Sequence, residues 1–287
     1  DGLGDMFKKI GITVAFCFFV VGCSSLKFAY GFMETLVGDW VENYLDIGEN
    51  DVMALEDEIS ALVTWHRNEM LPECAVFLEN QALLAETSGW TRAQVNEVVM
   101  MFRTMIKDTS HGAAPFIARV LVNHISTSKV NYMEAAMNKV ISERREQYDA
   151  PLADQIDAAV DKSVANFERF FGTLTEEQIA IVRKHKTETY DPTGGWLDWR
   201  IKRQQDLLRF LRTEPSVSDI EDYVKVALTT PEKIVGEAYR ERADRWWAGQ
   251  AELIYDLVDK FDLEQRQTTA DNLRGYAVDM VELADAS

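Results

Sequence analysis

Apolar residues recur at three- and four-residue steps along almost the whole of this 287-residue chain. Met33, Val37, Trp40 and Tyr44 follow this spacing, and similar runs continue to the C-terminus. Such spacing places the apolar side chains on one face of an α-helix. Only 15 Gly and 6 Pro interrupt the pattern, and strand-like alternation between turns is nearly absent. The sequence therefore predicts an all-α fold, a bundle of roughly ten amphipathic helices without a sheet.

Capping residues and helix breakers predict several helix boundaries. Thr175 and Gln178 form a capping box that predicts a helix start, and Pro72 predicts a kink or break. The apolar positions at 95–106 and at 116–121 predict two separate helices. Further helices are predicted near 196–213, 217–229, 231–261 and 263–285. The break at 191–195 divides the chain into helical halves, 23–190 and 191–287, which we expect to pack as one continuous domain.

The N-terminal segment has the order of an export signal. Lys8 and Lys9 precede an uncharged apolar run at 10–21, which is shorter than the roughly 20 residues that a membrane-spanning helix needs. The pattern of a bacterial lipobox follows, made of Val20, Val21, Gly22 and Cys23. We therefore expect residues 1–22 to be a removed signal peptide, with 1–5 upstream of the true start, and Cys23 to carry the lipid.

The residues around this cysteine predict a location and a redox state. By resemblance to enterobacterial sorting rules, Ser24 after the cysteine implies transfer to the periplasmic face of the outer membrane. Cys17 would be removed and Cys23 acylated, which leaves Cys74 with no intramolecular partner. We expect Cys74 to be a small buried apolar residue.

The charge balance limits the class of partner. The chain has 30 Lys and Arg against 48 Asp and Glu, a formal net charge of −18. Binding to nucleic acid by counterion release requires a basic surface, so nucleic acid is excluded as an expected partner. The expected partners are the membrane, through the lipid on Cys23, and an envelope protein.

One segment, Trp65, His66, Arg67 and Glu69, is a possible ligand or partner surface. Two other segments of this acidic chain gather basic residues around aromatic ones: the first is Trp196, Trp199, Arg200 and Arg203, and the second includes Tyr239, Arg240, Arg242, Arg245, Trp246 and Trp247. Such residues can form a pocket for an anion, with arginine as bidentate donor and indole as a stacking wall. The sequence favours the alternative, in which the tryptophans are core and the arginines reach outward to pair with acids.

Local signatures of catalysis are missing. Phosphate-binding loops, zinc-protease motifs and nucleophile elbows do not occur. His66 and Glu69 could share a metal ion, but a metal site usually needs three or four converging donors. We therefore expect no enzymatic activity, no cofactor and no metal.

Five segments together resemble one family of proteobacterial lipoproteins, domain of unknown function 6279. They are residues 23–30, 40–47, 65–72, 174–178 and 275–280. The resemblance covers essentially the whole chain after the signal peptide, and it implies a helical, lipid-anchored envelope protein. It supplies neither a reaction nor catalytic residues.

Three functions follow as hypotheses. The first is a non-catalytic outer-membrane lipoprotein whose helical domain is an interaction scaffold. The second is a holdase chaperone, because the pattern Leu-Thr-x-x-Gln at 174–178 is typical of small helical stress chaperones of the periplasm. The third is an anion-binding or enzymatic site, which requires Arg200, Arg203 and Arg240 to converge on one pocket.

Overall fold

The computed structural model describes residues 25–286, and this part of the chain contains helices and turns but no strand. The all-α prediction is confirmed. The predicted signal peptide and the lipobox residues Val20, Val21, Gly22 and Cys23 lie outside the described residues. In chain order the α-helices are α3 (Ser25–Gly31), α4 (Met33–Glu42), α5 (Val52–Trp65), α6 (Leu71–Thr87), α7 (Arg92–Leu121), α8 (Thr127–Glu146), α9 (Leu152–Phe171), α10 (Glu176–Thr189), α11 (Gly195–Leu211), α12 (Val217–Thr229), α13 (Glu232–Val235), α14 (Glu237–Val258) and α15 (Leu263–Asp285).

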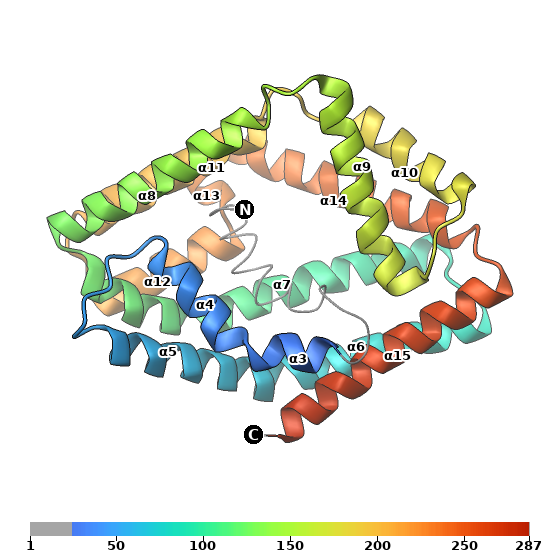
Figure 1. Cartoon of the computed structure of the whole chain (residues 1–287), viewed down its shortest axis with the longest axis horizontal. Coiled ribbons are helices and arrows are strands. Elements are labelled where there is room, and N and C mark those ends of the chain that lie inside the picture. The colour runs from blue at the N-terminus through green and yellow to red at the C-terminus, as the bar shows by residue number, and fades with distance from the viewer. Residues whose placement is uncertain (1–24, 287) are drawn as a thin grey trace.

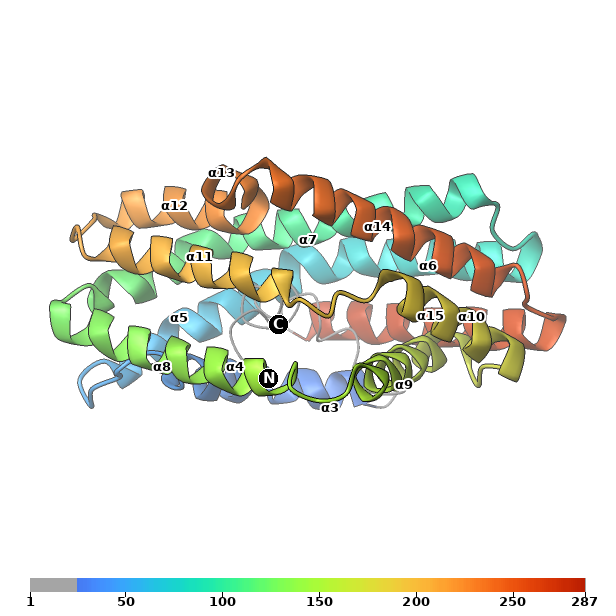
Figure 2. The same ribbon diagram turned by 90° about the horizontal axis from the view of Figure 1, so that it is seen from above.

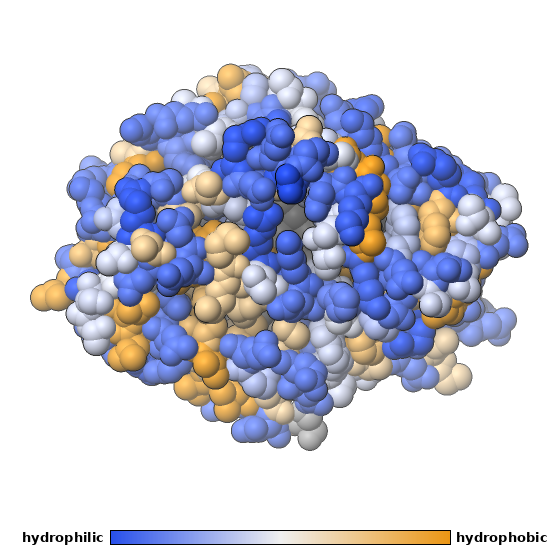
Figure 3. All heavy atoms as spheres, turned by 180° about the vertical axis from the view of Figure 1, so that it is seen from behind, coloured by the Kyte–Doolittle hydropathy of each residue, from blue (hydrophilic) through white to orange (hydrophobic). Residues whose placement is uncertain are grey.

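These helices form a flat body with a lozenge outline (Figure 1). Helices α8 and α11 follow one side of the lozenge, α9 and α10 the next, and α6 and α15 the side opposite α8. Seen from above, α3, α4, α8 and α9 lie at the front, and α7, α12, α13 and α14 lie at the back (Figure 2). The back face is mostly hydrophilic, with its apolar residues in separate groups (Figure 3).

Side-chain caps fix several helix starts. The box predicted at Thr175 is present, because its hydroxyl accepts from the backbone N–H of Gln178 while the glutamine side chain accepts from the Thr175 N–H. Thr91 makes the same box on α7, and Ser126 caps α8. The helix predicted over 231–261 is instead two helices, because Gly236 adopts a φ of +96° between α13 and α14.

The two helices predicted at 95–106 and 116–121 are wrong. Residues between Arg92 and Leu121 form the single helix α7, which contains both Gly112 and Pro115. Packing outweighs the weak helix propensity of glycine here, since the Trp65 indole lies where a Cβ at residue 112 would be.

The predicted kink at Pro72 takes the form of a π turn. Residues His66–Met70 make one wide turn, called η2, between α5 and α6, and Pro72 lies in the first turn of α6. A proline early in a helix removes an N–H that would have no partner, so α6 can follow directly. The turn also places His66 and Met70 in the buried interior.

Two groups of core residues define what we call the α8/α12 lobe and the α6/α15 lobe. The α8/α12 lobe is centred on large side chains, including Tyr44, Met133, Met137, Leu207 and Leu211. The α6/α15 lobe is centred on small side chains, Cys74, Ala75, Ala82, Ala85, Ala270 and Ala277, together with larger neighbours from α3 and α5. Cys74 is buried as predicted, and burial raises the pKa of its thiol to about 12.

The break at 191–195 does not separate the two halves in space. Helix α12 lies along α7, and α15 lies along α6, so elements after the break pack on elements before it.

None of the described helices is both long enough and apolar enough to cross a bilayer.

Candidate functional site

An aromatic–arginine cluster joins α11 to α14. The rings of Trp196, Trp199 and Tyr239 lie with centroids 5.5 to 5.6 Å apart and nearly edge to face. Arg242 lies 5.4 Å from the Trp196 ring and 5.6 Å from the Trp199 ring, and Arg203 lies 5.5 Å from the Tyr239 ring. These are cation–π distances, so the rings and the guanidinium groups stabilise one another.

Asp191 supplies a carboxylate to this cluster. It pairs with Arg242 at 2.5 Å and accepts hydrogen bonds from Thr193 and from the Gly195 N–H. Partial burial opposes its ionisation, but these hydrogen bonds and Arg242 outweigh burial and hold the pKa of Asp191 below its usual value. The charges of Asp191 and Arg242 therefore balance within the cluster, which connects the 191–195 loop, α11 and α14.

The anion-site hypothesis requires Arg200, Arg203 and Arg240 to converge, and Arg240 does not meet this condition. Its side chain is more than half exposed and pairs with Glu237 on the same helix. Tyr239 and Arg242, three residues apart, share the face of α14 that meets α11, and Arg240 is turned away by about 100°. Helical spacing was the signal that could have selected Arg242 in place of Arg240.

The segment around His66 forms a second, separate cluster in the α6/α15 lobe. The Tyr30 hydroxyl lies 2.9 Å from His66 Nδ1, and Arg67 lies 5.4 Å from the Tyr30 ring. Trp65 packs against Phe116, with ring centroids 6.0 Å apart. Glu69 is exposed. Among the described residues no three His, Cys, Asp or Glu side chains are placed to hold a metal ion.

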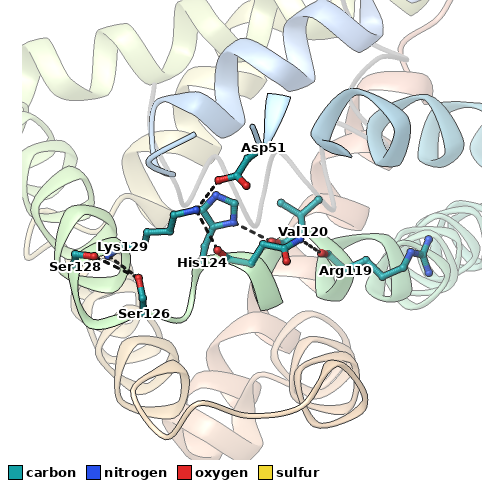
Figure 4. Close-up of polar contacts among 8 residues, drawn as sticks. Asp51, Arg119, Val120, His124, Ser126, Ser128 and Lys129 are labelled. Carbon is teal, nitrogen blue, oxygen red and sulfur yellow. Dashed lines mark hydrogen bonds and ion pairs between the residues drawn. The ribbon is translucent and has the colours of Figure 1, made fainter. Parts of the chain in front are cut away.

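A third polar cluster lies at the end of α7 (Figure 4). His124 Nδ1 lies 2.9 Å from the Val120 carbonyl, which can only accept, so Nδ1 carries a proton and donates. Lys129 donates to Asp51 at 2.6 Å and to the Asn123 carbonyl at 3.2 Å. Because His124 is buried, desolvation lowers its pKa. Sequence reasoning did not single out this cluster, since its residues are far apart in the chain.

An apolar cavity of about 120 Å³ lies in the α8/α12 lobe. Its walls come from α4, α5, α7, α8, α11 and α12, and include Leu36, Trp40, Phe116, Met133, Leu207 and Val224. Glu58 is the charged residue in this wall, and its carboxylate accepts from Arg119 Nε at 2.7 Å. Periodicity predicts which residues point inward, but it does not predict that they leave space.

The cavity has an energetic cost if it stays empty. At about 24 cal/mol per Å³, a fully enclosed void of about 120 Å³ would destabilise a fold by roughly 3 kcal/mol, which is an upper bound here because the cavity opens beside Leu36. That is a large fraction of the net stability of an ordinary domain. An apolar occupant would recover part of it.

The fold and these sites define a class of protein. It is an all-α body with an apolar cavity and an aromatic–arginine cluster in which Asp191 pairs with Arg242. Within that class, the chain belongs to the family of unknown function DUF6279, whose family model matches residues 43–240. The matched span runs from the end of α4 to the start of α14 and includes most of the cavity wall. No curated protein and no solved structure matches the chain.

Proposed function

We propose that this chain is a lipoprotein of the bacterial outer membrane, attached through lipid on Cys23, whose helical body faces the periplasm as a non-catalytic interaction scaffold. The observation that carries the proposal is the position of the lipobox. Residues 20–23 end two positions before α3 begins at Ser25, so the anchor would join the body with almost no tether.

The first helix after the anchor supports this proposal. Phe28, Phe32 and Leu36 recur every four residues along α3 and α4 and are exposed, with Phe28 at 67%. Leu26 and Tyr30, on the opposite face, are buried in the body. An exposed apolar stripe next to a lipid anchor is suited to the headgroup region of a bilayer.

The anchoring test uses two cysteine variants. Cells expressing the full chain are fed a labelled fatty acid, and membranes are separated from soluble protein. Cys23→Ser should abolish labelling and block removal of residues 1–22, whereas Cys74→Ser is the matched control and should keep both. Equal labelling of Cys23→Ser would refute the lipoprotein proposal. Ser24→Asp should move the protein from the outer to the inner membrane on a density gradient.

The scaffold part of the proposal has its own test. The lipidated chain is crosslinked in intact envelopes and purified through a C-terminal tag. We expect one or a few envelope proteins to copurify in defined ratio. Recovery of the chain alone under conditions that crosslink a known envelope complex would count against a scaffold.

A holdase chaperone is the second candidate, and the exposed stripe on α3 and α4 favours it, since monomers rarely leave large apolar surfaces uncovered. The protein should then suppress aggregation of unfolded clients at stoichiometric amounts. Phe28→Ser combined with Phe32→Ser should remove most of that activity. Absence of suppression for several unrelated clients would exclude this function.

The anion-site alternative has less support. Arg240 lies outside the aromatic–arginine cluster, and Asp191 and the aromatic rings already engage Arg242. The cluster is better suited to holding α11 against α14.

A further inference from the structure

We propose that the cavity in the α8/α12 lobe is a binding site for the end of a single alkyl chain, entered beside Leu36. This inference does not depend on lipidation of Cys23, because the alkyl chain can come from the protein's own anchor or from a membrane lipid. It rests on the chemistry of the wall, the size of the cavity and the surface that leads to its entrance.

The wall excludes polar ligands. Of the residues that line the cavity, Leu45, Leu55, Ile59, Leu62 and Met137 are buried apolar side chains. Glu58, the charged member, is neutralised by Arg119, and the Tyr223 hydroxyl donates to Asp206 at 3.1 Å. A ligand with an amide or hydroxyl group would lose its hydrogen bonds to water and gain none here.

The size excludes a polypeptide segment. A cavity of about 120 Å³ is somewhat smaller than the engineered apolar cavity of about 150 Å³ that binds benzene or xenon. It therefore holds a few methylene groups. A peptide would bring backbone N–H and carbonyl groups into a wall that offers them no partner.

The entrance distinguishes a chain from a compact ring. Leu36 lines the cavity and is also 52% exposed, so it lies at the boundary between cavity and solvent. It is the third member of the stripe that begins at Phe28, whose ring lies 4.8 Å from that of Phe32. An alkyl chain can lie along this stripe and insert its end past Leu36. A ring would fill the cavity without using the stripe.

One basic group contacts the cavity wall. Arg119 lies beside Phe116, 4.8 Å from its ring, and contacts Glu58 through Nε. Both of these partners line the cavity. Arg119 therefore keeps the Glu58 carboxylate paired at the cavity wall, and this charged lining residue offers no ionic partner to a ligand.

The test labels the site in cells. The full chain is expressed in cells fed a palmitic acid analogue with a diazirine at its methyl end, irradiated, purified and digested. The adducts should map to peptides that line the cavity, foremost those containing Trp40, Met133 or Met137. Adducts confined to peptides outside the cavity wall, or spread evenly over the exposed apolar residues, would overturn the proposal.

Two variants make the result specific. Leu36→Asp places a charge at the entrance, and Leu83→Asp is its matched control, since Leu83 on α6 is 54% exposed and does not line the cavity. Leu36→Asp should reduce cavity adducts at least about tenfold, as losing one apolar contact in a tight pocket can, and Leu83→Asp should leave them unchanged. Equal adducts in both would refute entry beside Leu36.

Filling the cavity from inside is an independent check. Ala227 lines the wall, and Ala227→Leu should remove the cavity adducts while the far-UV circular dichroism spectrum stays helical. Retention of the adducts would overturn the site.

Cys23→Ser separates the two sources of the alkyl chain. If the cavity adducts disappear in this variant, the occupant is the protein's own acyl chain. If they persist on a chain that no longer carries lipid, the occupant is a membrane lipid, and the site stands even though the anchor is gone.

Discussion

The α8/α12 lobe and the α6/α15 lobe use the same kind of helix to build different interiors. In the α6/α15 lobe, alanines such as Ala82, Ala85 and Ala270 are fully buried and let α6 and α15 approach closely along most of their length. In the α8/α12 lobe, Met133, Met137 and Leu207 keep the helices apart and leave a cavity between them. Small residues give close contact without voids, whereas large flexible ones span a wider gap and fill it incompletely.

The difference separates two tasks. A close-packed helix pair has no room for a ligand, and its stability depends on the exact volume of each side chain. A lobe with spare volume gives up part of its stability and can accept an occupant. The α6/α15 lobe is therefore the rigid part of the molecule, and the α8/α12 lobe is the adaptable part.

The largest expected effect is at the alanine interface. Ala82→Leu inserts three carbon atoms between α6 and α15, and we expect it to lower the free energy of unfolding by about 3 kcal/mol, near the upper end for overpacking. Urea unfolding followed by circular dichroism measures this. A loss of less than about 1 kcal/mol would mean that the α6/α15 lobe also has spare volume.

The next effect is expected where the Trp65 indole rests on α7. In Gly112→Ala the new methyl group would overlap this indole. The strain should exceed the roughly 1 kcal/mol that alanine gains in helix propensity, giving a net loss of about 1 to 2 kcal/mol. Combining it with Trp65→Leu removes the overlap, so a thermodynamic cycle of the four proteins should show strong coupling. Additive effects would show that Trp65 does not hold this position.

A substitution that fills the cavity should raise the free energy of unfolding. Ala227→Leu adds the same three carbons as Ala82→Leu but directs them into free space, so we expect a gain of up to about 1 kcal/mol in purified protein free of lipid. Urea unfolding of the two variants side by side gives the comparison directly. Equal destabilisation of both would abolish the distinction between the lobes.

The smallest expected effect is a pH dependence confined to the α8/α12 lobe. Desolvation keeps the pKa of folded His124 below its unfolded value of about 6.5, so the unfolded chain binds more protons as pH falls. The stability that neutral His124 contributes is present above about pH 6.5 and is lost as pH falls below it. His124→Gln should flatten this dependence in hydrogen exchange for the amides of η3, the 3₁₀ turn Val122–His124, and of the start of α8.

His185 provides the matched control for that measurement. It lies on α10, and burial also lowers its pKa, but it is remote in the chain from η3. His185→Gln should change the pH dependence of α10 and α14 and leave η3 unaffected. A shift at η3 in the His185 variant would show that the two regions titrate together.

Local rules predicted much of this fold. The Thr175 capping box and the helices near 196–213, 217–229 and 263–285 follow from hydrogen-bonding side chains and period alone, and all of them are present. The apolar positions at 95–106 and 116–121 predict two helices, but α7 runs through both, and Trp65, distant in sequence, packs where a Cβ at Gly112 would lie. The continuity of α7 therefore depends on tertiary packing, which the local sequence does not predict.

The candidate sites were predicted less well for the same reason. Trp196, Trp199 and Arg203 do lie together, but the choice between Arg240 and Arg242 depends on which face of α14 meets α11. The His124–Lys129–Asp51 contacts join segments that no motif relates. The cavity is a difference between the volume that helices enclose and the volume that side chains occupy, and no residue pattern encodes that difference.

Helix α7 connects the two ends of the molecule energetically. Its N-terminal part contributes Val95 and Val99 to a core with Ala251 of α14, and its C-terminal part contributes Ala114 and Ala118 to the core around the cavity. A break in this helix would remove support from both cores at once. The protein should therefore unfold in a single cooperative transition, and an occupant in the cavity should slow hydrogen exchange as far away as the amides beside Ala251.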